Sequence, residues 1–311
     1  MPRNKVAIIG AGISGLYLGW KLSEKGNDVT IFEKKPEIGN EVCSGLFSRR
    51  IVDFVPQSKS LVENEINSVV IHFPKKDVRV GFSKSFFVMS HYELDKIVAG
   101  LAQKSGVKII LNSSVSSVPE GFDKIIGCDG AESSVRKNLN LSSPRLRLGV
   151  QGFEDKENRD DFVETWPCES GFIWKIPRGK KTEYGAMSSV RSAGKVFNDF
   201  IREKEIEITD MKAKLIPQGL AFPSDEKITL CGDAAGLTKP WSGGGVIWSM
   251  IAADMLVDSF PDFSKYQKKA KRFFLPKILL SKTATKLVYF FGFKASWLLP
   301  KKAKIDPDFL F

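Results

Sequence analysis

Residues 5 to 15 read KVAIIGAGISG, a short apolar run followed by three glycines in the spacing G-x-G-x-x-G. An uninterrupted apolar run such as Val6 to Ile9 is typical of a parallel strand that is covered on both faces. The next residues, LYLGWKLSEKG, continue as a helix as far as Gly26. The order of strand, glycine turn and helix predicts an α/β fold that begins with a dinucleotide-binding unit.

Each glycine of this turn has its own structural role. Gly10 permits the tight turn, Gly12 lets the backbone approach a pyrophosphate, and Gly15 allows close contact between helix and strand. Ala11 and Ser14 belong to the same turn. The N-terminus of the helix then offers unpaired N–H groups and a partial positive charge to the phosphates.

The second apolar strand, DVTIFEK, ends at Glu33, followed by Lys34. A carboxylate at this point accepts hydrogen bonds from both ribose hydroxyls of a dinucleotide. It also disfavours a 2′-phosphate, so the sequence argues against NADP in this site and leaves FAD or NAD.

Two later segments repeat the pattern of an apolar strand that ends in an acid. KIIGCDGAESSVRKNL (124–139) ends its strand at Asp129 and Gly130, and residues 226–256 place Asp233 at the end of another strand. Gly243 to Gly245 then precede a helix.

These three motifs, in this order, resemble the flavoprotein hydroxylase superfamily. Within it the chain is most similar to the geranylgeranyl reductase family, which includes archaeal digeranylgeranylglycerophospholipid reductases. The matching segments are EVCSGLF (41–47), GFIWKIPRG (171–179) and GDAAGLTKPWSGGGVIWSM (232–250). With the N-terminal unit, the resemblance extends over most of residues 1 to 260.

The resemblance implies that FAD lies extended between the two glycine clusters. Asp233 would accept hydrogen bonds from the ribityl chain, and the helix that begins near Gly244 would direct its positive end at the flavin N1–C2=O edge, where negative charge accumulates on reduction. The predicted cofactor-binding residues are Gly10, Ala11, Gly12, Ser14, Gly15, Glu33, Lys34, Cys43, Ser44, Gly45, His91, Val115, Asp129, Gly130, Gly232, Asp233, Gly243, Gly244, Gly245 and Val246.

The chain departs from the family pattern at two places. Family members carry an Arg four residues before the Asp of the helix in the first domain. In this chain the segment SHYELDKIV has His91 at that position, four residues before Asp95. The Cys-Gly-Gly of the family is Cys43-Ser44-Gly45 here, a partial match. A helix N-cap at Ser90 or His91 is the alternative to a role beside the pyrophosphate. If His91 faces the pyrophosphate, flavin affinity should depend on pH near neutrality.

Residues 143–219 contain alternating, aromatic-rich runs that predict an antiparallel sheet, and residues 69–90 extend it. This sheet would cover the flavin and form the substrate pocket. Phe172 and Trp174 share one face of a strand; ordinary sheet core is the alternative for both. The predicted substrate-lining residues are Phe172, Trp174, Pro177 and Trp241.

Reduction of an isolated alkene needs a hydride and a proton, in a site that excludes water. Cys43 is the candidate proton donor, with a buried structural thiol as the alternative reading. Cys128 and Cys231 are expected in the core. Because a single dinucleotide fingerprint is visible, electrons would come from a transient NAD(P)H, a ferredoxin or another donor.

The sequence therefore predicts a discontinuous FAD-binding domain (1–68, 91–142 and 220–262), a substrate domain (69–90 and 143–219) and a basic, amphipathic helical region (263–311). In the last region one helical stripe is formed by Leu280, Ala284, Leu287, Val288 and Phe291, with Lys282, Lys286 and Tyr289 on the opposing side. Contact with an anionic membrane is one reading of this helix, and packing on the FAD domain is the other.

The composition limits the kinds of partner and cofactor that the chain is expected to bind. The 311 residues carry 47 Lys and Arg against 36 Asp and Glu, a net charge of +11, which favours anionic partners. No basic block alternates with aromatic residues, which argues against nucleic acid, and the scattered cysteines and histidines argue against a metal site. No export signal or spanning segment is visible, so a cytoplasmic protein, peripheral on the membrane, is expected.

The activity favoured is FAD-dependent reduction of isoprenoid double bonds, on an archaeal membrane lipid or its precursor. An FAD-dependent monooxygenase of an aromatic or lipid substrate is the first alternative. A flavin-binding protein without turnover is the second.

Overall fold

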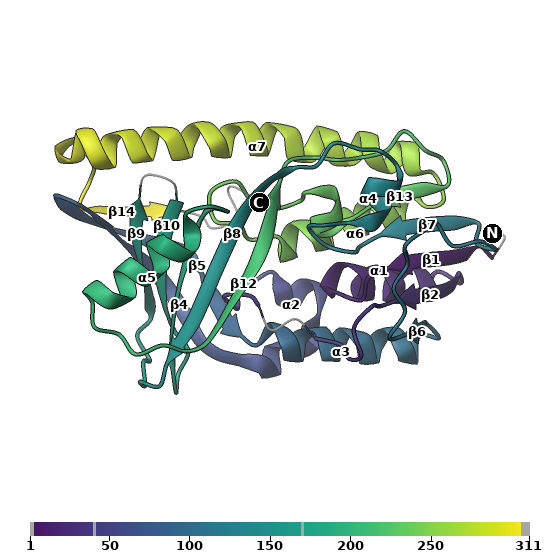
Figure 1. The fold of residues 1–311 in the computed structure, drawn as a ribbon, viewed down its shortest axis with the longest axis horizontal. Helices are drawn as coiled ribbons and strands as arrows, with labels where there is room; N and C mark the ends of the chain where they lie inside the picture. The colour runs from purple at the N-terminus through teal and green to yellow at the C-terminus, as the bar shows by residue number, and fades with distance from the viewer. Residues whose placement is uncertain (1–2, 40–41, 169–170, 306–311) are drawn as a thin grey trace. The chain divides into compact units, whose positions relative to one another are not determined.

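A computed structural model describes residues 3–39, 42–168 and 171–305 of the chain (Figure 1). The chain divides into two compact units, each built around its own β-sheet. The parallel-sheet unit comprises residues 1–40, 92–145 and 217–278. The mixed-sheet unit comprises residues 41–91, 146–216 and 279–311.

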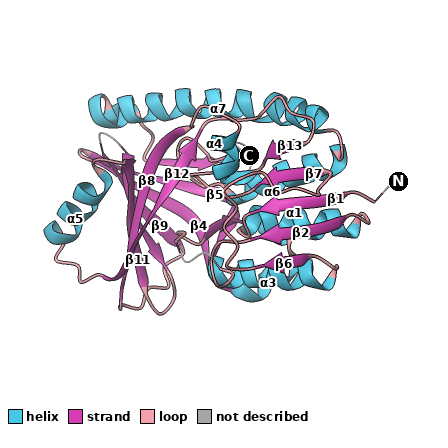
Figure 2. Ribbon diagram, turned by 45° about the vertical axis from the view of Figure 1, so that its right-hand side comes forward, coloured by secondary structure: helices cyan, strands magenta, loops and turns pink. Residues whose placement is uncertain are grey.

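The parallel-sheet unit contains five strands in the order β13-β7-β1-β2-β6 (Figure 2). All four pairings are parallel. In the centre, Ile8 pairs with Ile31 and Ile126, and none of the three side chains is exposed, as expected of a sheet covered on both faces. The strands are β1 (Lys5–Ile9), β2 (Asp28–Phe32), β6 (Lys108–Ile110), β7 (Lys124–Gly127) and β13 (Ile228–Leu230).

Two apolar helices of this unit pack on each other, α1 (Ile13–Glu24) and α6 (Val246–Ser259). α6 is mostly apolar and ten of its fourteen residues are buried, whereas Asp258 is exposed and Asp254 accepts a hydrogen bond from Tyr17. Its Trp248 is 1% exposed and packs on Phe274 at 5.1 Å between ring centroids. The unit's other helical elements are α3 (His91–Lys104), α4 (Ser134–Asn138), η2 (Gly232–Ala235) and the first part of α7 (Phe263–Lys294). The predicted Rossmann-like architecture is confirmed.

The mixed-sheet unit contains nine strands in the order β12-β8-β11-β10-β9-β4-β5-β14, with β3 paired to β5. Its pairings are antiparallel from β8 through β11 and β10 to β9, whereas β4 with β9 and β5 with β14 are parallel. The strands are β3 (Leu46–Ser48), β4 (Val62–Phe73), β5 (Lys76–Met89), β8 (Arg145–Glu154), β9 (Phe162–Cys168), β10 (Gly171–Pro177), β11 (Thr182–Ser189), β12 (Thr209–Gln218) and β14 (Lys302–Ile305). Three short helical elements complete the unit: α2 (Ile51–Phe54), η1 (Pro56–Leu61) and η3 (Ser296–Leu298).

The main core of this unit forms where helix α5 (Ala193–Glu203) covers one face of the sheet. Phe197 and Phe200 of α5 pack against Val150, Ile173 and Tyr184. Because side chains alternate along a strand, the neighbours of Ile173 in β10, Phe172 and Trp174, point to the other face. One face of β10 therefore belongs to the core, and the other is available for a site.

The observed boundaries differ from the predicted domains. Residues 41–68 belong to the mixed-sheet unit, because β3 and β4 both pair with β5. The sheet is mixed rather than wholly antiparallel. The C-terminal region, predicted as helical, also contributes the strand β14.

The second part of α7 packs through its small and polar side. Tyr289 donates a hydrogen bond to the Gly171 carbonyl at 2.8 Å, and Gly292 lies so close to Phe73 that a Cβ would be 1.9 Å from its ring. Ser281 is 3% exposed. The apolar stripe predicted for this helix is exposed at Leu280, Leu287 and Val288.

Candidate functional site

The glycine turn between β1 and α1 has the geometry its three predicted roles require. Gly10 has φ +102°, and a Cβ there would lie 2.5 Å from the Cys128 carbonyl oxygen. A Cβ on Gly15 would lie 2.0 Å from the Gly10 carbonyl oxygen, so helix and turn are in close contact. At Gly12 no heavy atom lies within 4 Å of an added Cβ, which leaves open space beside the backbone. A phosphate group fits at that point.

Glu33 is fixed in place at the end of β2. Its carboxylate accepts hydrogen bonds from the Ala11 N–H at 2.7 Å and from the Lys35 N–H at 3.0 Å. Each carboxylate oxygen retains a lone pair, so both can also accept from ribose hydroxyls. Lys34, predicted with it, is exposed just beyond the strand.

Asp129 caps helix α4 at the end of β7. Its Oδ2 accepts hydrogen bonds from the Ser134 hydroxyl at 2.9 Å and the Val135 N–H at 3.1 Å, and Ser134 also donates to the Val115 carbonyl at 3.1 Å. The other oxygen, Oδ1, is buried and has no hydrogen-bond partner in the described part of the chain. Gly130 follows with φ +83°, which favours glycine. Val115 and Asp129 thus lie together, as the predicted site requires.

The late glycine cluster lies directly on the early one. Gly232 has φ +64°, and a Cβ there would lie 2.3 Å from the Ser14 hydroxyl oxygen of α1. At the start of α6, a Cβ on Gly245 would lie 3.1 Å from the Asp233 carboxylate. The two predicted halves of a dinucleotide site are therefore neighbours in one unit.

Two helix N-termini of this unit are suited to anions. Neither α1, preceded by Gly12, nor α6, preceded by Gly245, has a side-chain cap or an acidic residue in its first turn. Their first N–H groups and their positive dipole ends are thus available to a phosphate or to a reduced ring. Together with the open space at Gly12, the described residues fit an FAD-type dinucleotide.

In the mixed-sheet unit, the loop Cys43–Gly45 is the centre of a second cluster. Gly45 has φ +63°, its carbonyl accepts from the Met89 N–H at 2.9 Å, and the Cys43 carbonyl accepts from Gln151 at 3.4 Å. His91, at the start of α3, is 7% exposed and stacks edge-on against Phe47. Its predicted place beside a pyrophosphate stays a prediction.

The Cys43 thiol is set apart from the other cysteines by its surroundings. Burial raises its pKa, but the His91 ring, both by its charge and by a hydrogen bond, lowers it, as do the Gly45 backbone and the Lys214 ammonium, and the net pKa lies below the ordinary value. Cys128 and Cys231 are buried against each other, which raises the pKa of Cys128. Cys43 and Cys128 thus differ in direction: the pKa of the Cys43 thiol lies below its ordinary value and that of Cys128 above it, which favours Cys43 for proton exchange.

Arg178, just beyond β10, joins this loop to two carboxylates. Its guanidinium donates to the Ser44 carbonyl at 3.0 Å, to Glu183 at 3.2 Å, and through two nitrogens to Glu63 at 2.9 and 3.2 Å. Glu183 on β11 is fully buried and also accepts from the Trp174 indole at 3.0 Å. Burial raises the pKa of Glu183 to about 7, against the opposing effects of Arg178 and the Trp174 hydrogen bond.

This network was not predicted as part of the site. Arg178 stands in the quoted segment GFIWKIPRG, and Glu183 is the one acid within TEYGAMSS, a strand whose other residues are uncharged. A charged residue inside a buried strand is the signal that could have identified it, since such a charge needs a partner.

The predicted substrate-lining residues fall in both units. Phe172 and Trp174 are half-buried on one face of β10, with ring centroids 5.8 Å apart, and Pro177 is buried at its end. Trp174 lies flat on Gly185, where a Cβ would be 2.1 Å from the indole. Trp241 belongs to the parallel-sheet unit, before Gly243–Gly245, and is 37% exposed. Phe172 and Trp174 are thus neither core residues nor fully exposed.

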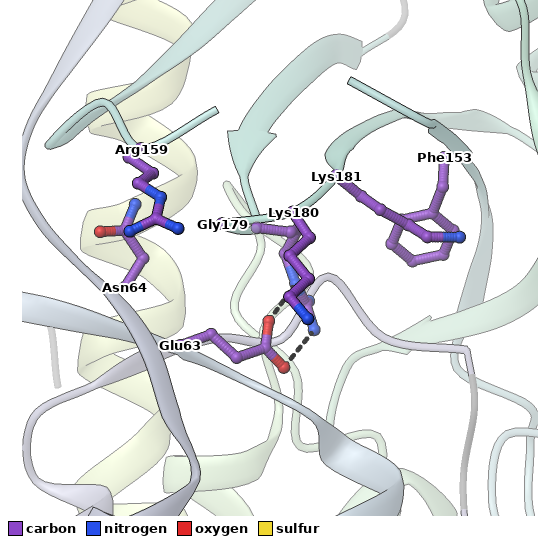
Figure 3. A pocket seen from close by; sticks show the side chains of 8 residues that line it. Glu63, Asn64, Phe153, Arg159, Gly179, Lys180 and Lys181 are labelled. Carbon is purple, nitrogen blue, oxygen red and sulfur yellow. Dashed lines mark hydrogen bonds and ion pairs between the residues drawn. The ribbon is translucent and has the colours of Figure 1, made fainter. Parts of the chain in front are cut away.

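A pocket of about 630 Å³ lies beside this network in the mixed-sheet unit (Figure 3). Figure 3 shows Glu63, paired with Arg178 by the dashed lines, between the strand that carries it and the loop of Gly179 and Lys180. Four of the eight lining residues are cationic, and Glu63 is the one acid among them. The pocket therefore favours an anionic group. Its lining residues are Glu63, Asn64, Phe153, Arg159, Arg178, Gly179, Lys180 and Lys181.

Across residues 3–39, 42–168 and 171–305, no three His, Cys, Asp or Glu side chains come together in a way that could hold a metal ion. Among the helices of the described chain, none combines the length and the apolar character needed to cross a membrane.

Comparison with known proteins supports the glycine-rich unit and the family resemblance. Residues 8–57 match the family model of the NAD(P)-binding Rossmann-like domain. Digeranylgeranylglycerophospholipid reductase of Methanococcus vannielii is 24% identical over 286 residues, 79% of this chain and 73% of the relative. The reductase of the same name from Methanothrix thermoacetophila is 23% identical, over 83% of this chain and 78% of the relative.

Solved structures share the fold. A geranylgeranyl bacteriochlorophyll reductase-like protein from Thermoplasma acidophilum has a TM-score of 0.76 and 19% identity, covering 88% of this chain and 84% of the other. A myxobacterial chondrochloren halogenase described as FAD-dependent has a TM-score of 0.73 and 14% identity, covering 93% and 83%. The predicted resemblance to geranylgeranyl reductases is confirmed.

Proposed function

We propose that this chain, an FAD-dependent oxidoreductase of the geranylgeranyl reductase type, adds hydrogen across carbon–carbon double bonds of geranylgeranyl chains in a membrane lipid or its precursor. The observation that best supports FAD binding is the close approach of Gly232 to Ser14, which brings the early and late glycine clusters together in one site. The substrate class is supported by the names of the relatives and by the aromatic face of β10.

When bound, reduced FAD would supply the hydride, and the side chains around the site must do the rest. The site must hold the alkene, exclude water and supply a proton to the second carbon, so that two electrons and two hydrogens are added in total. Phe172 and Trp174 supply an apolar wall for the isoprenoid. Cys43, held beside His91, supplies the proton and recovers it from solvent. A reduced nicotinamide or a ferredoxin returns the electrons.

The basic pocket suits the polar end of such a lipid. A phosphate carries negative charge, and Lys180 and Lys181 line the pocket next to Arg178. Substitution of Lys180 and Lys181 by Gln should raise the KM for a phospholipid substrate and leave the KM for geranylgeraniol, which has no phosphate, unchanged. An equal rise for both substrates would contradict a phosphate site in this pocket.

We also propose that the second part of α7 contacts an anionic membrane. By helical periodicity, Leu279, Leu280, Leu287 and Phe290 lie on the side opposite the packed Ser281, and each of the four is more than half exposed. The exposed Lys282 and Lys286 lie along one edge of this apolar side, an arrangement typical of helices in the lipid headgroup region.

An anaerobic assay tests the proposed reaction. Purified protein with chemically reduced FAD is given a geranylgeranyl phospholipid, and the product is analysed by mass spectrometry. A gain of one H₂ for each double bond is expected. No gain, with reduced flavin still bound, would contradict the reductase and favour the alternative, an FAD-dependent monooxygenase, which the same protein would reveal with NAD(P)H and oxygen.

Sedimentation with vesicles tests the membrane contact. At low salt, vesicles that contain anionic lipid should carry the protein into the pellet, and neutral vesicles should carry less, because the lysines lose their attraction. Equal recovery in the supernatant with both kinds of vesicle would refute the contact.

A further inference from the structure

The Arg178 guanidinium occupies a place from which it can control the Cys43 loop. Its Nη1 lies where a side chain on residue 45 would stand, since a Cβ on Gly45 would be 2.2 Å from it. The same nitrogen donates to the Ser44 carbonyl at 3.0 Å. Arg178 therefore contacts both residues that follow Cys43.

Two carboxylates fix the guanidinium in this position. Glu63 on β4 binds it through both oxygens, and Glu183 on β11 binds it from the interior of the unit. The Arg178 side chain is 11% exposed and Glu183 is fully buried, so solvent screens the contact with Glu183 little, whereas Glu63 is 33% exposed. A planar guanidinium bound on several edges has one orientation.

The loop has a second set of restraints on its other side. Met89 donates to the Gly45 carbonyl at 2.9 Å, and Gln151 donates to the Cys43 carbonyl at 3.4 Å. His91 is two residues beyond Met89, so the strand end that binds Gly45 also positions the imidazole. The backbone of Cys43 to Gly45 is thereby held from both sides by hydrogen bonds, next to the strand end that leads into His91.

We infer that Arg178 is a positioning residue for the reaction: clamped by Glu63 and Glu183, it fixes Ser44 and Gly45 and thereby holds the Cys43 thiol against His91. This inference rests on the proposed function in so far as Cys43 is the proton donor. The geometry itself does not depend on that function. Small displacements of a reacting group cost large factors in rate, so a residue that fixes the loop matters as much as one that touches the substrate.

Alkylation of Cys43 tests the inference without any substrate. The intact protein is treated with iodoacetamide at a series of pH values, and modification of the peptide that contains Cys43 is quantified by mass spectrometry. The midpoint of the rate against pH reports the thiol–thiolate equilibrium. The variants are Arg178→Met, which removes the guanidinium, and Arg178→Lys, which keeps the charge without the planar group.

Lys175→Met is the matched control, because Lys175 is a cation of the same segment that pairs with Glu164 and not with the loop. We expect the midpoint to rise by about one pH unit in both Arg178 variants, as the thiol loses its fixed contact with His91, and to stay unchanged in Lys175→Met. If Arg178→Met fails to fold, as judged by circular dichroism, Arg178→Lys is decisive.

An unchanged midpoint in a folded Arg178 variant would overturn the inference. So would an equal rise in Lys175→Met, which would indicate a general effect of charge. Reductase assays of the same variants separate the two proposals. A raised midpoint in an enzyme whose kcat is unaffected would retain the hold of Arg178 on the Cys43 loop, but would reject both Cys43 as the proton donor and a role of Arg178 in the reaction.

Discussion

Replacement of Glu183 by Gln removes a buried acid while keeping its shape and its hydrogen bond from Trp174. Burial raises the pKa of Glu183 from 4.5 to about 7. Between these values the folded protein binds a proton that the unfolded chain has released, so the acid stabilises the fold at low pH and this contribution is lost as pH rises through 7. From pH 5 to pH 8 the loss amounts to roughly 2.5 kcal/mol.

The measurement is urea unfolding of the wild type and of Glu183→Gln at half-unit steps from pH 5 to pH 8. We expect the wild type to lose stability relative to the variant as pH rises, with most of the change below pH 7. Glu203→Gln serves as the control, because the Glu203 side chain is 73% exposed in the same unit. Its difference from the wild type should stay constant.

Parallel stability curves for the wild type and Glu183→Gln would refute this reasoning. They would mean that Arg178 and the hydrogen bond from Trp174 offset burial, so that the carboxyl has the same pKa in the folded and unfolded protein. A divergence in the opposite direction, with the wild type gaining relative stability above pH 6, would mean that the ion pair with Arg178 outweighs burial.

Four substitutions test other parts of the structure. Gly12→Ala should leave stability unchanged and weaken FAD binding in a flavin titration, because the added methyl group meets only open space where the cofactor is expected. Gly15→Ala should impair folding itself, as read by circular dichroism, because its Cβ would lie 2.0 Å from the Gly10 carbonyl oxygen. Gly45→Ala should lower the free energy of unfolding by roughly 1–3 kcal/mol, since its φ of +63° disfavours a side chain and Arg178 fills the space. Leu287→Glu should leave the melting temperature within error and reduce sedimentation with anionic vesicles, since the side chain is 52% exposed.

The glycine turns were predictable because their signals are local. The roles of Gly10, Gly12 and Gly15 follow from spacing within one strand-turn-helix segment, and the structure shows the matching contacts. Asp129 and Asp233 follow from the rule that acids at the ends of parallel strands meet at one edge of the sheet. Residues that lie close together in the sequence were therefore enough to predict the glycine-rich half of the candidate site.

The Arg178 network could not be predicted in this way. Its members come from β4, from β11 and from the turn after β10, and they meet through the pairing of four strands, β11, β10, β9 and β4. The β10–β11 register, which places Glu183 opposite Ile176, is fixed by packing over the whole sheet. Residues 41–68 were grouped with the wrong sheet for the same reason, because the partner of β3 and β4 lies beyond them in the chain.

The contact of Gly232 with Ser14 also constrains how the protein is made. During synthesis the N-terminal turn leaves the ribosome first, yet β13, η2 and α6, which complete its surroundings, follow only after residue 227. Until then β7 has an open edge and the apolar side of α1 lacks its partner α6. The nascent chain therefore carries an unfinished cofactor site until β13, η2 and α6 have been made, and a product that ends before α6 would leave the apolar side of α1 uncovered.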